Sequence, residues 1–153
     1  EQTNFDSDDG DIVAAKVSEE EEAYQKIKDE FGFDPVRMYY LPENMKFQEA
    51  TILCELQNIC LIYEDGKKAN ISYQVNTNYN TNSMGLDMED TFVKEYDMEV
   101  NNVCVYIKQY QMLEGRDRKI RATFEYNDNQ YFITGNGLKE EEFNKIIKNL
   151  NFF

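Results

Sequence analysis

The absence of histidine limits the chemistry that this chain can perform. None of its 153 residues is His, so serine and cysteine nucleophiles lack the imidazole base on which their catalytic systems depend. The densest carboxylate runs are Glu19–Glu22 and Glu140–Glu142. Two carboxylates about 5–10 Å apart across a cleft could hydrolyse a glycoside. Both runs, however, stand where a helix is predicted to begin, and the helix dipole favours negative charge there. The sequence therefore predicts no catalytic residue.

The cysteines and acidic residues do not match a known metal or cofactor motif. Cys54, Cys60 and Cys104 are an odd number, which argues against a disulfide framework, and their spacing fits no zinc motif. The acidic run Asp6–Asp11 resembles a calcium loop, but its glycine stands at the fifth position instead of the sixth and no Glu stands at the twelfth. The glycines form no phosphate-binding loop. We therefore expect free thiols, no metal and no cofactor.

The dense positive cluster of the chain is a candidate contact site. It consists of Arg116, Arg118, Lys119 and Arg121. Because the formal net charge of the chain is −14, such a concentration of cations could bind an anion or orient a protein partner. The alternative is a charged hairpin tip, predicted at residues 114–119, that keeps the edge of a sheet soluble.

A second candidate site is a polar loop predicted at residues 76–85, which is rich in Asn. Asn78, Tyr79 and Asn80 could offer hydrogen bonds and an aromatic face to a sugar or a peptide. The alternative is a long surface loop without a ligand.

Hydrophobic periodicity predicts that an α+β fold positions these residues. We expect an antiparallel meander sheet of about six to eight strands, with an N-terminal helix and a C-terminal amphipathic helix packed on it. Residues 86–100 fit either a strand or a short helix, and we favour a strand. The predicted strands are 36–40, 46–54, 59–64, 69–76, 86–100, 103–112, 119–126 and 131–134.

Side-chain patterns also predict which faces are buried. The first helix is expected to have Ser18 as its N-cap and Gly32 as its C-terminal stop. One face of the last helix, predicted at 138–150, should pack on the sheet. We expect that face to share a core with alternate residues of two strands: Val103, Val105, Ile107, Ile133, Phe143, Ile146, Ile147 and Leu150.

The distribution of charge predicts one domain preceded by a tether. Residues 1–30 hold 11 acidic and 3 basic side chains and so account for −8 of the net charge of −14. Residues 1–17 lack periodicity, and we expect them to be a flexible, dispensable acidic tether. Residues 18–153 are predicted to form a single α+β domain. Most of its surface should repel nucleic acid and anionic lipid.

Several short motifs resemble a bacterial family, the domain of unknown function 4367. The resemblance covers about residues 36–150 and rests on Tyr40–Met45, Leu61–Glu64, Tyr131–Gly135, Glu141–Phe143 and Ile146–Leu150. It departs from the family at Asn44, where a Gly is usual, and at Phe124–Tyr126, where many members have a Trp. The resemblance implies a domain outside the membrane of Gram-positive bacteria, behind a signal peptide or a single spanning helix. It implies similarity to membrane-anchored anti-sigma or sporulation proteins, and it supplies no catalytic residues.

Taken with the residues, this resemblance predicts an extracytoplasmic binding or sensory domain that is not an enzyme. Its partner would be a protein or a component of the cell envelope. We expect contact with the membrane only through an anchor upstream of Glu1. The first alternative is a carrier of lipid or another hydrophobic ligand, which needs an apolar cavity between the sheet and its helices. The second is a small hydrolase that uses carboxylates alone, which needs clustered carboxylates with raised pKa values.

Overall fold

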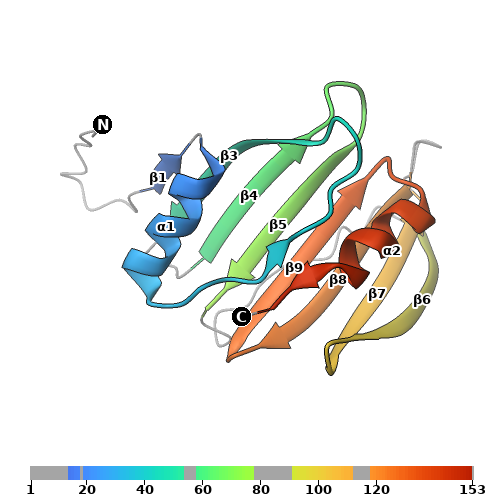
Figure 1. Ribbon diagram of the computed structural model, residues 1–153. Coiled ribbons are helices and arrows are strands. Elements are labelled where there is room, and N and C mark those ends of the chain that lie inside the picture. The colour runs from blue at the N-terminus through green and yellow to red at the C-terminus, as the bar shows by residue number, and fades with distance from the viewer. Residues whose placement is uncertain (1–13, 18, 54–57, 78–90, 112–117, 153) are drawn as a thin grey trace.

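The fold is an antiparallel sheet with two helices on one face, seen here in a computed structural model (Figure 1). The structure describes residues 14–17, 19–53, 58–77, 91–111 and 118–152. The sheet has eight strands, and every pair of neighbours is antiparallel. In spatial order the strands are β1 (Ala14–Val17), β3 (Lys46–Leu53), β4 (Asn58–Glu64), β5 (Asn70–Asn76), β9 (Asn129–Asn136), β8 (Arg118–Tyr126), β7 (Val103–Gln111) and β6 (Thr91–Val100).

This topology confirms the predicted α+β class and divides the predicted meander into two. Strands β3, β4 and β5 form one meander, and β6 to β9 form another. The two are joined where β5 pairs with β9, with Tyr73 opposite Ile133. Residues 86–100 fitted either a strand or a short helix; residues 91–100 form strand β6, as favoured, and residues 86–90 lie outside the described part of the chain. Two-residue turns with positive φ close the last hairpins at Asn101-Asn102 and Asn127-Asp128, a backbone conformation that Asn and Asp tolerate well.

The first helix, α1 (Glu20–Phe31), packs on the β1, β3 and β4 side of the sheet. Its buried residues are Ala23, Tyr24 and Ile27, and Gly32 ends it in the left-handed conformation with φ 78°, as predicted. The predicted N-cap, Ser18, is not the cap in the structure, where the N-cap is Glu19 and its side chain makes no capping bond. Ser18 itself lies outside the described residues. The acidic first turn instead complements the helix dipole.

The second helix, α2 (Glu140–Lys148), confirms the predicted C-terminal stripe. Phe143, Ile146 and Ile147 are completely buried against the sheet. Leu150 is also buried, but it lies beyond the helix, in a two-residue strand β10 (Leu150–Asn151) that pairs with β2 (Arg37–Met38). The strand residues predicted to share this core are Val105, Ile107 and Ile133, which are buried, and Val103, which is half-buried.

Buried tyrosines attach α1 and the segment around β2 to the sheet. The hydroxyl of Tyr63 donates to Oε2 of Glu20 at 2.7 Å. The hydroxyl of Tyr73 donates to the carbonyl oxygen of Val36, whose N–H donates to the hydroxyl of Tyr131 at 3.3 Å. Burial raises the pKa of Tyr63 and Tyr73 well above the usual range, which disfavours loss of the proton that each hydroxyl donates. These hydroxyls therefore have a structural role.

The N-terminal boundary differs from the prediction. Residues 14–17 were expected to belong to the tether, but they form β1, which pairs with β3 from Ala14 opposite Leu53 to Val17 opposite Ala50. A short segment without periodicity is a weak strand signal, and pairing with an existing strand overrides it. Residues 1–13 lie outside the described part of the chain.

Candidate functional site: the helix-free face of the sheet

One face of the sheet carries no described helix. α1, α2 and the β2–β10 ribbon all lie on the opposite face (Figure 1), and we call the remaining surface the helix-free face. On β9 the side chains of this face are buried, since Phe132 and Thr134 are each only 7% exposed. Over β6 to β8 its side chains are half-buried or exposed. Those of β7 and β8 alternate with the core residues and are Cys104, Tyr106, Lys108, Tyr110, Lys119, Arg121, Thr123 and Glu125.

Three cations meet on this part of the helix-free face. Lys108 of β7 lies directly opposite Arg121 of β8, and Lys119 precedes Arg121 by two residues on the same side of β8. Side chains in such positions start about 5 Å apart across the strands and about 7 Å apart along one strand. All three are half-buried. We call Lys108, Lys119 and Arg121 the basic patch.

Aromatic and hydroxyl groups surround the basic patch. The ammonium of Lys108 lies 5.7 Å from the ring centroid of Tyr106, and that of Lys119 lies 5.8 Å from the ring centroid of Tyr110. These distances are within the range of a cation–π contact. Nε of Arg121 donates to Oγ1 of Thr134 at 3.2 Å. These contacts hold the side chains of the patch in place.

Amide side chains lie next to the patch on β5 and β9. Asn136 pairs across the sheet with Lys119 on one side and with Asn70 on the other. Its Nδ2 donates to Oδ1 of Asn70 at 2.9 Å, while its own Oδ1 is buried and has no hydrogen-bond partner among the described residues. Oε1 of Gln130 is likewise buried and has no hydrogen-bond partner among the described residues. Buried polar atoms without a partner are uncommon in proteins, so these two acceptor oxygens are exceptions among the described residues.

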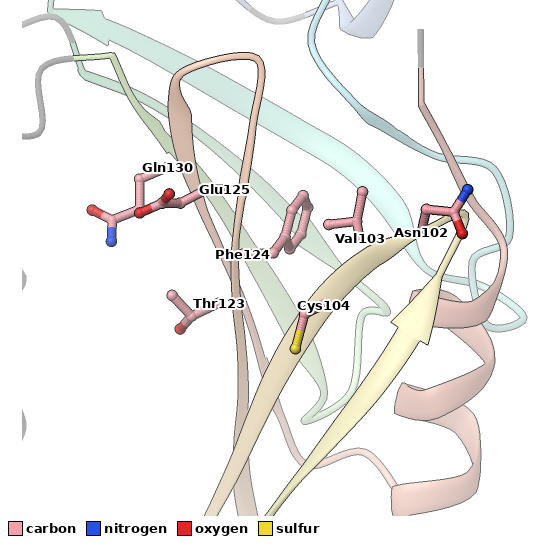
Figure 2. Close-up of a pocket in the computed structure, with 7 residues that line it drawn as sticks. All are labelled: Asn102, Val103, Cys104, Thr123, Phe124, Glu125 and Gln130. Atoms are coloured by element: carbon pink, nitrogen blue, oxygen red, sulfur yellow. The ribbon is translucent and has the colours of Figure 1, made fainter.

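A shallow hollow of about 420 Å³ opens at one end of the face. The ladder between β7 and β8 ends at Tyr106 opposite Thr123, and beyond that pair the two strands separate. Figure 2 shows Phe124 and Val103 on one side of the opening and Glu125 and Gln130 on the other. The exposed thiol of Cys104 also lines it. The lining mixes apolar, amide and charged groups.

The structure separates the predicted positive cluster. Lys119 and Arg121 lie together on the helix-free face, but Arg118 points to the opposite face, where its Nη1 donates to Oε1 of Gln109 at 3.1 Å. Arg118 and Lys119 belong to strand β8 and not to the expected hairpin tip. Arg116 lies outside the described residues, as does the predicted ligand loop with Asn78, Tyr79 and Asn80. Lys108 was missed, because its neighbourhood depends on the register between β7 and β8.

The structure places the second carboxylate run and two of the three cysteines. Glu140 begins α2, and its carboxylate lies 3.0 Å from the ammonium of Lys94. The neighbouring Gln109 amide and the Lys94 ammonium lower the pKa of Glu140, whereas a general acid needs a raised one. Cys60 and Cys104 are free thiols, and Cys54 is outside the described residues. Across the described ranges, no cluster of three or more His, Cys, Asp or Glu residues could hold a metal ion.

Comparison with known proteins identifies the family of this chain but no individual relative. Neither a curated protein nor a solved structure is significantly similar to the chain. Neither described helix is long and apolar enough to cross a membrane. The model of a family described as a domain of unknown function, DUF4367, matches residues 35–150, from just before β2 to the first residue of β10. Since this match covers more than half of the 153 residues, the chain belongs to the DUF4367 family.

Proposed function

We propose that this chain is an extracytoplasmic binding or sensory domain of a membrane-anchored bacterial protein, and that it contacts a component of the cell envelope through its helix-free face. One observation carries the proposal. Lys108, Lys119 and Arg121 gather beside Tyr106 and Tyr110 on an accessible surface, although the chain as a whole has a net charge of −14. A local field opposite to that of the body orients a partner as it approaches.

The arrangement of charge supports binding over a purely structural role. Lys108 lies directly opposite Arg121, and like charges in that position destabilise an antiparallel sheet. On its other side Lys108 lies opposite Glu95 of β6, whereas Arg121 lies between Lys108 and Thr134 and has no acidic residue opposite it. Features that cost stability without a structural gain are typical of functional surfaces. The membrane-anchored, extracytoplasmic setting is supported by what the family resemblance implies.

The two alternatives have less support. A lipid carrier needs an apolar cavity between the sheet and its helices, but Phe143, Ile146 and Ile147 are fully buried there and fill that layer. The hollow of about 420 Å³ lies elsewhere and includes Glu125 and Gln130 in its lining. A hydrolase that uses carboxylates needs one with a raised pKa, and the pKa of Glu140, in the run Glu140–Glu142, is lowered.

Retention of the folded chain by isolated bacterial cell envelopes tests the proposal. The wild type is compared with the double variant Tyr106→Ser/Lys108→Ser on the helix-free face. The matched control is Tyr39→Ser/Lys148→Ser, which removes one tyrosine and one lysine from the side that carries the helices, where both are exposed. Circular dichroism and urea unfolding establish that each variant is folded.

We expect the wild type and the control variant to sediment with the envelopes and the helix-free variant to remain largely in solution. The proposal is wrong if the wild type is not retained by wall or membrane fractions. It is also wrong if the control variant loses retention as much as the helix-free variant does.

A further inference from the structure

We propose that the gap between the ends of β7 and β8 binds an extended peptide segment that carries a basic side chain. We call this gap the fork; it consists of the hollow of about 420 Å³ described above and the strand ends on its two sides. Pockets that hold small ligands have volumes of about 300–1,000 Å³. The fork is accessible, because Cys104 on one side and Glu125 on the other are exposed. The inference does not rest on the proposed function, since it concerns other residues and another ligand than the basic patch.

The fork lies between two hairpins whose turns are at the same end of the sheet (Figure 1). The β6–β7 hairpin turns at Asn101-Asn102, and the β8–β9 hairpin turns at Asn127-Asp128. Each hairpin remains paired up to its turn, but the ladder that joins β7 to β8 already ends at Tyr106 opposite Thr123. Among the described residues, each hairpin therefore presents a strand end that has no neighbouring strand on the side of the fork.

The main-chain N–H and C=O groups of Cys104 and Glu125 point into the fork. In an antiparallel sheet these two groups of a residue point to the same neighbouring strand, and the neighbour alternates along the chain. A two-residue turn makes the residues that flank it a hydrogen-bonded pair, so the groups of Val103 point to β6 and those of Tyr126 point to β9. The groups of Cys104 and Glu125 then point toward each other, yet these two residues are not paired.

These main-chain groups can pair with an added strand. No main-chain hydrogen bond outside the helices and strands of the described residues involves Cys104 or Glu125. Unpaired N–H and C=O groups at a strand edge are a template for another extended chain. Extended peptides bind to sheets in this way, with affinity from main-chain hydrogen bonds and specificity from alternate side chains. The interrupted ladder therefore favours a peptide as the ligand.

Aromatic packing holds the β8 side of the fork in place. Phe124 stacks on Tyr131 with 4.9 Å between the ring centroids. The ring of Phe152 packs edge-on against Phe124 and Tyr126, with centroids 5.8 Å and 5.0 Å away. Such arrangements are the ones that aromatic pairs prefer. Because these contacts do not involve β7, they fix the end of β8 independently of the strand on the other side of the fork.

The charge around the fork favours a basic ligand. Two exposed carboxylates flank it: Glu125 on β8, and Glu99 on β6, which lies opposite Cys104. Neither carboxylate forms an ion pair with a described residue. None of the residues that line the hollow is basic (Figure 2). Gln130, which lies opposite Glu125, adds a buried acceptor oxygen without a partner among the described residues. A Lys or Arg side chain and the N–H groups of a peptide complement this set of acceptors.

Two other occupants must be separated from a peptide. A second copy of this chain would bring a net charge of −14 to a surface that already has two carboxylates, so repulsion opposes it. A small polyamine would match the carboxylates but has no main-chain groups to pair with the strand ends.

Binding of a defined peptide tests the inference. The probe is a fluorescent hexapeptide of alternating lysine and valine with blocked ends, a pattern that favours an extended chain, and fluorescence anisotropy measures its affinity for the folded chain. Three competitors each lack one property of the probe. They are the same peptide with every main-chain N–H methylated, a hexapeptide of alternating glutamate and valine, and the polyamine spermidine.

Two variants and one thiol locate the binding site. The fork variant is Glu125→Lys. The matched control is Glu64→Lys, which makes the same change of charge at an exposed residue at the end of β4. Circular dichroism establishes that both variants are folded. The exposed thiol of Cys104 lines the hollow, so its rate of alkylation, measured by mass spectrometry with and without the probe, reports occupancy of the fork. Cys60 is the internal reference.

We expect the lysine–valine peptide to bind the wild type and to slow the alkylation of Cys104 several-fold without changing that of Cys60. Each competitor should bind at least about tenfold more weakly than the probe. Glu125→Lys should lose about tenfold in affinity, and the control variant should stay within about twofold.

The inference is overturned if the lysine–valine peptide does not bind, if it binds without protecting Cys104, or if any competitor binds as tightly. It is also overturned if the control variant loses as much affinity as the fork variant. A wild-type dimer that Glu125→Lys dissociates, detected by sedimentation, would assign the fork to a second copy and would also overturn it. Retention by cell envelopes is measured separately, so failure of this inference leaves the proposed function intact.

Discussion

Truncation of Ile146 to Ala probes the contact between α2 and the sheet, on which the whole fold depends. Ile146 is 0% exposed and lies among the buried residues of α2. The substitution removes three side-chain carbons. At about 0.8 kcal/mol for each buried CH₂, the lost transfer free energy is about 2.4 kcal/mol. The cavity that remains adds to this cost, while the higher helix propensity of Ala returns less than about 0.7 kcal/mol. We therefore expect a loss of about 2–5 kcal/mol in the free energy of unfolding.

Urea unfolding followed by circular dichroism measures this loss. The midpoint should fall with little change in slope, since the surface exposed on unfolding stays nearly the same. Lys148→Ala is the matched control, because Lys148 is exposed on the same helix. It should change stability by less than about 0.5 kcal/mol. A loss of under about 1 kcal/mol for Ile146→Ala, or equal losses in the two variants, would refute the packing of α2 described above.

Three further predictions concern local contacts. Gly135→Ala should destabilise the fold by about 1–3 kcal/mol, because an added Cβ would lie 2.9 Å from side-chain carbons in and just before α2; the urea midpoint measures the loss. Glu140→Gln should cost up to about 1 kcal/mol at neutral pH and low salt. The pKa of Glu140 is lowered by Gln109 and Lys94, so this stabilisation is present above the unfolded-state pKa and is lost as the pH falls through the folded-state pKa; the wild type and the variant should become equally stable in acid. In the native protein Cys104 should react with a thiol reagent faster than Cys60, because Cys104 is exposed and burial raises the pKa of Cys60; equal labelling rates, measured by mass spectrometry, would contradict this.

Local patterns were enough to predict the elements of the fold. Ile71, Tyr73 and Val75 alternate with polar residues, and all three are buried on one face of β5. The stripe of α2 and the asparagine turn at Asn101-Asn102 also follow from residues that are close in sequence. Periodicity of about 3.6 or 2 residues records which side of an element is buried, so such features can be read without knowing the partner.

Features that depend on distant partners could not be predicted in the same way. The pairing of β5 with β9 joins residues about 60 apart in the sequence, and no local pattern specifies it. The β2–β10 ribbon has only two residues in each strand, which is too short to show periodicity. Four residues of β1 pair with β3 in a segment without a strand signal.

The candidate site also combines features that local patterns contain with features that depend on distant partners. The prediction grouped Arg118 and Lys119 in one cluster at a hairpin tip, but the alternation along β8, with Ile120, Ala122 and Phe124 buried, puts these two residues on opposite faces. The addition of Lys108 to the patch required the register in which it lies opposite Arg121. A shift of one residue would have turned that side chain to the other face.

The most direct test of the central claim is a lysine footprint of the wild-type chain with and without bound bacterial envelopes. An amine-reactive ester labels exposed lysines, and mass spectrometry measures the modification of each one. Lys108 and Lys119 lie on the helix-free face, and Lys145 and Lys148 are exposed on α2. If the helix-free face is the contact surface, binding should reduce the labelling of Lys108 and Lys119 several-fold and leave Lys145 and Lys148 unchanged. Protection of the α2 lysines with continued labelling of Lys108 and Lys119 would contradict the account.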